Sequence, residues 1–158
     1  MSFTINYDAI RKRIEEVSVI DSEIVYFVKQ KKEPCPECIF DPIRRESTNP
    51  FCPVCGGKGF VTQDVKTAIT ACVDRATGLE NVYQAGGRLQ KGDVVMTVHE
   101  RELVKAGYPL DADWATEFDW IEIAGRKYIL AEGDSVIPQT LQGQIYEVIF
   151  HLSHEGRQ

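Results

Sequence analysis

Two C-x-x-C pairs that lie close together in the chain place the strongest constraint on how this sequence can fold. Cys35 and Cys38 form the first pair, Cys52 and Cys55 form the second, and thirteen residues separate them. Four thiolates at this spacing suit a tetrahedral metal ion, because each pair binds one edge and the loop between them closes the site. We therefore predict a four-cysteine zinc ribbon over residues 31–60. Two disulfides, or four unrelated thiols, are the alternatives that the spacing leaves open.

The residues around the pairs favour a structural zinc ion over a catalytic one. Four cysteines already fill a tetrahedral shell, whereas a catalytic zinc keeps one position open. The three histidines of the chain all lie far from the loop (His99, His151 and His154). The run Gly56-Gly57-Lys58-Gly59 follows the second pair, and its glycines allow positive φ angles that point backbone amides at a thiolate. A redox role is less favoured, because a redox C-x-x-C motif needs no second pair.

Charge and length narrow the classes of function. The chain has 158 residues, 43% of them apolar, which is enough for one domain with a hydrophobic core. Its net charge of −6 argues against a general nucleic-acid binder. Residues 1–58 carry nine basic and nine acidic side chains, so the whole negative charge lies in residues 59–158. The zinc half is therefore the part that could contact a phosphate backbone.

The sequence predicts no membrane partner and a reducing compartment. It contains no apolar run of signal-peptide length near its start and no stretch of about 20 apolar residues. Five cysteines without a signal peptide fit a reducing compartment better than a disulfide scaffold. Cys72, the fifth cysteine, is expected to be a small packing residue within a strand.

Hydrophobic periodicity predicts a mainly β chain. Apolar residues three or four apart (Tyr7, Ile10, Ile14 and Val17) predict an amphipathic helix over residues 7–17. Alternation and β-branched residues predict extended segments over 23–30, 59–62, 67–74, 93–98, 135–137 and 144–152. A hairpin is predicted from 118–123 through Ala124-Gly125 to 126–130. We expect one or two helical turns over 100–106, closed by Gly107. The strand over 135–137 is expected to end at a break at Pro138.

This pattern predicts a small antiparallel barrel, SH3-like or related, with a short N-terminal helix and the inserted four-cysteine zinc ribbon. An OB-fold or a sandwich fits the strand spacing as well. Residues 1–30 would supply the helix and the first strand, and residues 61–158 the remainder of the barrel, with a central loop over 99–117. The zinc ribbon would be an insertion between two strands that pair.

No group of residues forms a convincing catalytic site, and we expect the protein not to be an enzyme. Asp111 and Asp113 could bind a metal or act as acid and base, but carboxylates on a loop are more often solvated. His99 next to Glu100 could be a general base, although a surface histidine at a strand end is the more common arrangement. His151 and His154 could join a metal site, yet they fall near the end of a strand and in the tail. No phosphate-binding loop and no nucleophile elbow occur.

Two segments of the C-terminal half resemble a known family. The string DWIEIAGRKYIL over residues 119–130, followed by QIYEVIFHL over 144–152, resembles the head-closure or stopper proteins of tailed bacteriophages. In that family a D-x-I-x-I-x-G-x-x-Y-x-I hairpin precedes a long closing strand. The string KGDVVMTV over residues 91–98 looks like the strand before the family's central loop. The resemblance covers about residues 67–152, and the zinc loop is a departure from the family's pattern.

The resemblance implies a structural protein of the virion neck, assembled in the host cytoplasm. It implies a small β-barrel that forms a homo-oligomeric ring between a portal or adaptor protein and a tail protein. Residues 99–117 would face the channel and help retain packaged DNA, and their acidic side chains would repel its phosphates. The alternative is a nucleic-acid-binding or chaperone-like zinc-ribbon module. Cys52 to Gly59 resembles one C-x-x-C-x-G-x-G unit of the DnaJ cysteine-rich domain, which mainly supports zinc.

Overall fold

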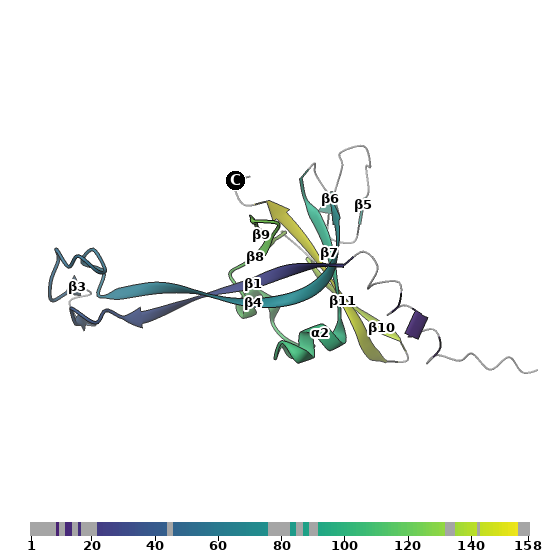
Figure 1. Cartoon of the computed structure of the whole chain (residues 1–158), viewed down its shortest axis with the longest axis horizontal. Coiled ribbons are helices and arrows are strands. Elements are labelled where there is room, and N and C mark those ends of the chain that lie inside the picture. The colour runs from purple at the N-terminus through teal and green to yellow at the C-terminus, as the bar shows by residue number, and fades with distance from the viewer. Residues whose placement is uncertain are drawn as a thin grey trace, which may run out of the picture. The chain divides into compact units, whose positions relative to one another are not determined.

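A computed structural model describes residues 9, 12–13, 16, 22–43, 46–75, 83–84, 87–88, 92–131, 135–141 and 143–154. The chain divides into two compact units (Figure 1). Unit 1 comprises Met1–Phe27 and Thr67–Gln158, and unit 2 comprises Val28–Lys66. The first and fourth strands contribute residues to both units. The predicted helix over 7–17 lies mostly outside the described residues, and the four that are described there are helical and exposed (Ala9, Lys12, Arg13 and Glu16).

Strands dominate the described residues, as the sequence predicts. The strands are β1 (Ser22–Pro34), β2 (Phe40–Asp41), β3 (Glu46–Ser47), β4 (Phe60–Arg75), β5 (Tyr83–Gln84), β6 (Gly87–Arg88), β7 (Val94–His99), β8 (Trp120–Ile123), β9 (Arg126–Leu130), β10 (Val136–Leu141) and β11 (Gln144–His154). The described helices are α2 (Glu100–Lys105) and α3 (Trp114–Glu117). Neither of these helices is long and apolar enough to span a membrane.

Seven strands form one sheet, in the order β10-β11-β7-β4-β1-β8-β9. The pairs whose register is defined are antiparallel. β9 also pairs with β11, with Leu130 opposite Leu152, so the last strand of the order returns to the second. The mainly antiparallel β fold is thus confirmed, whereas the SH3-like barrel stays a prediction at this level of description.

Most of the predicted strands are confirmed, and two segments that were predicted separately form one strand, β4. The hairpin β8–β9 forms as predicted, with Ala124 at φ 48° and Gly125 at φ 75° in its turn. The sequence predicts separate segments over 59–62 and 67–74, but β4 continues from Phe60 to Arg75 as one strand of 16 residues. Three of the four residues over 63–66 are polar or charged and suggest an interruption, yet the segment lies in a strand that pairs with β1, which is itself 13 residues long. A backbone partner can therefore keep a polar segment extended.

The predicted strand break at Pro138 is wrong. Pro138 lies inside β10, where it is opposite Val148 of β11, and the register shifts only afterwards, between Gln139 and Thr140. β10 is the first strand in the order of the sheet, so one of its sides has no neighbouring strand there. Proline lacks a backbone N–H and is tolerated in a strand when that position faces away from the ladder.

An aromatic cluster forms the centre of the core of unit 1. Phe27 of β1 contacts Phe118, Tyr108 and Phe150, with ring centroids 4.8, 5.3 and 5.6 Å away. Trp114 of α3 packs edge-on against Phe150 of β11 at 5.1 Å. The segment 99–117, for which the sequence predicts a loop with one or two helical turns, thus contains two helices anchored in the core. α2 agrees with the predicted turns over 100–106, whereas no sequence signal indicated α3.

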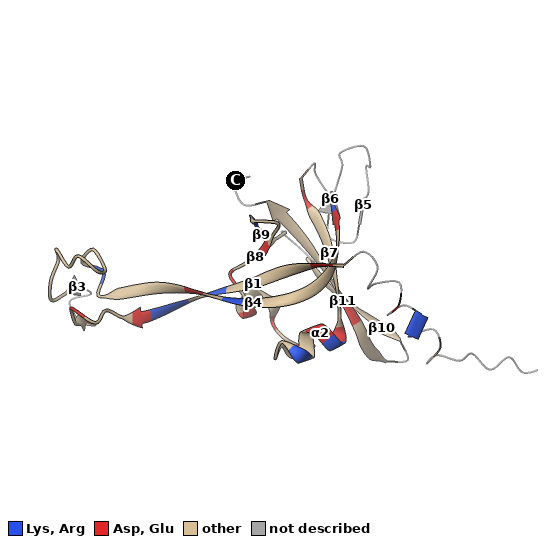
Figure 2. Ribbon diagram, viewed as in Figure 1, with Lys and Arg blue, Asp and Glu red and all other residues tan. Residues whose placement is uncertain are grey.

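Unit 2 has almost no apolar core. Its strands are the second half of β1 and the first half of β4, and most of their residues are exposed, on both faces. Acidic and basic residues occur along both strands (Figure 2). Gln30 donates to Asp64 Oδ1 at 3.1 Å, and the Lys32 ammonium lies 5.0 Å from the centre of the Phe60 ring. Within the described part of unit 2, the buried apolar residues are Val28 and the four cysteines. A two-stranded ribbon of this kind is marginal without a further constraint.

The aromatic cluster gives a test of the fold. We expect Phe27→Ala to lower the free energy of unfolding by about 3–5 kcal/mol, because a fully buried ring with three ring contacts is lost. Ile24→Ala should change it by less than about 0.5 kcal/mol, because Ile24 lies on the other face of β1 and is 61% exposed. Urea unfolding followed by tryptophan fluorescence measures both variants. Equal stability of the two variants would contradict the assignment of Phe27 to the centre of the core.

Candidate metal centre

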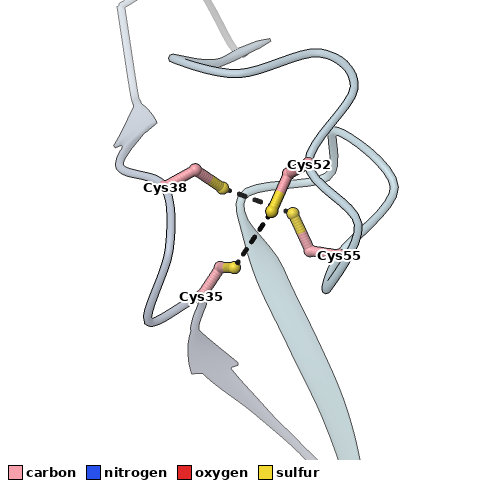
Figure 3. Close-up of side chains that lie close together, drawn as sticks. All are labelled: Cys35, Cys38, Cys52 and Cys55. Carbon is pink, nitrogen blue, oxygen red and sulfur yellow. Dashed lines mark hydrogen bonds between the residues drawn. The ribbon is translucent and has the colours of Figure 1, made fainter.

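The ends of β1 and β4 bring the four predicted cysteines together. Cys35 follows the last residue of β1, and the second pair is separated from the start of β4 only by the glycine-rich run. Cys35 Sγ lies 3.6 Å from Cys52 Sγ, and Cys38 Sγ lies 3.3 Å from Cys55 Sγ (Figure 3). Each short contact therefore joins one thiol of the first pair to one of the second. All four sulfurs lie within 4.8 Å of one another, and all four residues are buried.

These distances are compatible with a metal site. A tetrahedral ion bound to thiolates at about 2.3 Å separates its sulfurs by about 3.8 Å, within the range found here. A disulfide needs about 2.05 Å between the sulfurs, and no cysteine of the chain forms one in the structure. The structure thus contains the cluster that the spacing predicted and neither of the two disulfides left open as an alternative.

Backbone hydrogen bonds hold both cysteine turns. The Cys35 amide donates to the Gly59 carbonyl at 3.1 Å, which extends the contact between the two chain segments beyond the strand ends. The Cys52 amide donates to the Asn49 carbonyl at 3.2 Å, and the Gly56 amide to the Cys52 carbonyl at 2.8 Å. The Asn49 side chain also accepts from the Phe51 amide at 3.1 Å, as asparagine does in an Asx turn. Asn49 was missed at the sequence level, although Asn-Pro is a turn signal.

Two glycines of the run after Cys55 are required by the geometry. Gly57 has φ 83°, and a Cβ atom there would collide with the Pro50 carbonyl oxygen. Gly59 has φ 76°, and a Cβ atom there would lie 2.8 Å from the Cβ atom of Phe40. The Gly59 amide donates to Cys55 Sγ at 3.2 Å. This confirms the expectation that a glycine in this run points an amide at a thiolate.

Cys38 and Cys55, whose sulfurs form the shorter of the two contacts, differ in their pKa values. Burial raises the pKa of Cys38 to about 12, and the hydrogen bonds with the other three cysteines add to the rise. Burial also acts to raise the pKa of Cys55, but the bonds from Cys38 and from the Gly59 amide outweigh it and lower that pKa to about 6. Cys55 is therefore the sulfur best prepared to be a thiolate, and a cation would be needed to deprotonate its partner.

The other candidate ligands do not join a metal site. His99 caps α2, with its Nδ1 accepting from the Arg101 amide at 3.2 Å. His151 is buried in β11, not at a strand end, and burial lowers its pKa. His154 packs its ring against Tyr128, with ring centroids 5.5 Å apart. His151 and His154 are three residues apart in β11, so their side chains point to opposite faces of the sheet.

The two loop carboxylates are exposed, as expected for solvated groups. Asp111 and Asp113 lie on the surface, and Asp113 caps α3 through its backbone carbonyl, which accepts from Thr116, and not through its side chain. Within the described ranges, the four cysteines are the group of side chains close enough together to hold a metal ion. The structure thus places the candidate site in unit 2.

The glycine geometry gives a test of the site. We expect Gly59→Ala to weaken Co²⁺ binding by about tenfold more than Gly56→Ala, a difference of about 1.4 kcal/mol. Both substitutions strain a positive φ, but only Gly59 is also packed against Phe40, whereas a Cβ atom at Gly56 meets no atom within 4 Å. Absorption of the cobalt–thiolate complex measures both affinities. Equal losses in the two variants would show that the contact with Phe40 has no part in holding the site.

Comparisons of the chain with protein-family models, with curated proteins and with solved structures gave no match.

Proposed function

We propose that Cys35, Cys38, Cys52 and Cys55 hold one structural zinc ion. Four thiolates complete a tetrahedral shell and leave no position for a substrate or a reactive water. The spacing of the sulfurs suits zinc, and unit 2 needs a constraint of this kind because the cysteines themselves are most of its buried apolar residues. Metal binding would then supply the stability that the small core of unit 2 does not supply.

Metal content tests this proposal with a matched control. The purified chain should contain about one equivalent of zinc, and Cys52→Ser should lower this to less than about half an equivalent, because three thiolates bind the ion more weakly. Cys72→Ser should keep the full equivalent, since Cys72 lies in β4 opposite Thr97 and outside the cluster. Elemental analysis after dialysis measures all three proteins. Full zinc content in Cys52→Ser would end the proposal.

We further propose that the chain is a structural protein of a tailed-bacteriophage neck, a head-closure or head-to-tail connector component that works as a ring. The observation that carries this proposal is the pairing of β9 with β11. This pairing makes the β8–β9 hairpin and β11, the two segments that carry the family resemblance, neighbours in the sheet. It also joins the last strand of the sheet order to the second. Such closure is what a small SH3-like barrel requires.

The acidic segment between β7 and β8 supports a role in retaining DNA. It carries six acidic residues against two basic ones, and Glu102 pairs with Lys105 at 3.8 Å. The acidic residues are Glu100, Glu102, Asp111, Asp113, Glu117 and Asp119. Its two helices are anchored in the core through Leu103 and Trp114, so its carboxylates would be presented by a fixed segment. A ring of such segments would repel DNA phosphates and act as a gate.

The neck role is tested in particles of the phage whose genome encodes the chain. Mass spectrometry of purified particles should detect the protein in several copies, and antibody labelling should place it between head and tail. Deletion of the gene should give heads without tails that lose their DNA. Absence of the chain from purified particles, or labelling at the tail tip, would show the neck assignment to be wrong.

A nucleic-acid-binding or chaperone-like module remains the second candidate, because the charge of unit 2 favours it. Residues 28–66 contain seven lysines and arginines against five acidic residues, a balance of +2. That role predicts that the purified chain binds DNA, RNA or unfolded polypeptide, and that chelation abolishes the binding. The neck role predicts a ring in particles and no such chelator-sensitive affinity. Gel-shift titration with and without chelator distinguishes the two.

A further inference from the structure

A short segment between the two C-x-x-C pairs is bonded to the chain next to both of them. It comprises Ser47, Thr48 and Asn49, and is here called the clamp. The hydrogen bonds that join it to its neighbours run between nitrogen and oxygen atoms, and none of them involves a sulfur. These bonds can therefore form whether or not an ion is bound to the cysteines.

Thr48 holds the chain directly after the first pair. The Ile39 amide donates to Thr48 Oγ1 at 3.1 Å, and the Thr48 amide donates back to the Ile39 carbonyl at 2.9 Å. Ile39 is the residue that follows Cys38, and the contact continues beyond it with Phe40 of β2 opposite Ser47 of β3. The path of the chain as it leaves Cys38 is therefore fixed from across the loop.

Asn49 holds the chain directly before the second pair. Its carbonyl oxygen accepts from the Cys52 amide at 3.2 Å and from Ser47 Oγ at 2.8 Å. Its side-chain Oδ1 accepts from the Phe51 amide at 3.1 Å. One residue thus binds two consecutive backbone amides at the start of this cysteine turn, and one of them belongs to a ligand.

The strand ends and the clamp fix the two cysteine turns at opposite ends. The bond from the Cys35 amide to the Gly59 carbonyl joins the outer ends of the turns, next to β1 and β4. The clamp joins their inner ends, because Thr48 and Asn49 are consecutive residues. Thirteen residues separate the two pairs, and ordering such a loop when the ion binds would cost conformational entropy. Bonds that already hold the turns lower this cost and so raise the affinity of the site.

We propose that Thr48 and Asn49 are positioning residues of the metal site, which hold the inner ends of the two cysteine turns in the arrangement that the ion requires. They set the affinity for the ion through the ligands and without contacting it, as outer-shell hydrogen bonds do in other metal sites. This inference rests on the proposed metal site and names the residues that tune it.

Substitution of Thr48 tests the clamp at the first pair. Thr48→Val replaces the hydroxyl by a methyl group and keeps the branched shape, so that the Ile39 amide loses its side-chain acceptor. It should weaken Co²⁺ binding by about fivefold, as expected for the loss of one hydrogen bond. Thr48→Ser keeps the hydroxyl and should bind Co²⁺ within about twofold of the unmodified chain. The Thr48 side chain is exposed, so neither variant removes a core contact.

Substitution of Asn49 tests the clamp at the second pair in the same way. Asn49→Ala removes the acceptor of the Phe51 amide and should also weaken Co²⁺ binding by about fivefold. Asn49→Asp keeps a side-chain oxygen that can accept from this amide, and should restore the affinity to within about twofold. Rescue by the conservative variant at both positions is the result that a merely bulky or solvated side chain would not give.

The spectrum of the cobalt complex separates positioning from the loss of a ligand. All these variants keep the four cysteines, so at saturating Co²⁺ each should show the four-thiolate absorption of the unmodified chain, and the concentration needed for saturation should change. Ile43→Ala is the matched control, because its side chain lies in the same loop and is 92% exposed. It should bind Co²⁺ like the unmodified chain.

Two kinds of contrary result can be told apart. An unchanged affinity in Thr48→Val and Asn49→Ala, or an equal loss in Thr48→Val and Thr48→Ser, would overturn the inference and leave the metal site in place. Absence of Co²⁺ binding in the unmodified chain would refute the metal site, and the inference with it.

Discussion

The pairing of β1 with β4 is the interaction on which both units depend. In unit 1 the two strands are central in the sheet order, between β7 and β8, and Glu23 and Arg75 join them with an ion pair of 2.6 Å. In unit 2 the same two strands continue, and the buried apolar residues of its described part are Val28 and the four cysteines. The ends of the two strands bring Cys35 next to Gly59, and the two C-x-x-C turns meet there. The pairing of two strands that are distant in the sequence thus brings the two cysteine pairs together. The cysteines need no surrounding hydrophobic core to meet.

Sequence spacing predicted the cysteine cluster well because its constraint is chemical and local. Four thiolates with fixed turns have few arrangements that suit an ion, and the glycines after Cys55 specify the amide that faces its sulfur. The β8–β9 hairpin was predictable for the same reason, since Ala124-Gly125 is a turn at positive φ. Asn49 shows the limit of local signals, because its part in holding Cys52 depends on how the whole loop folds.

The parts of the fold that were missed depend on neighbours distant in the chain. A proline such as Pro138 is tolerated in a strand when its nitrogen faces a side that has no neighbouring strand. The sequence does not show that β10 is first in the order of the sheet. The mostly polar segment 63–66 stays extended because β1 pairs with the strand that contains it. Trp114 and Phe118 occur in a segment whose composition indicates an acidic loop, yet the packing of these two rings on Phe150 and Phe27 makes the segment part of the core. The acidic residues correctly indicated that part of this segment is exposed. That Trp114 and Phe118 are buried could be seen only from the packing in the structure.

Zinc at the cysteine cluster and the pairing of β1 with β4 would stabilise the same arrangement of unit 2. Cys35 follows the last residue of β1, and Cys55 is separated from the start of β4 by the glycine-rich run, so an ion bound to both would join the ends of the two strands. Linkage makes the effect reciprocal, so a change that strengthens the strand pairing must raise the affinity for zinc by the same factor by which zinc stabilises the pairing. Substitutions along the ribbon, such as one at Gln30 or Asp64, would therefore change metal affinity without touching a ligand.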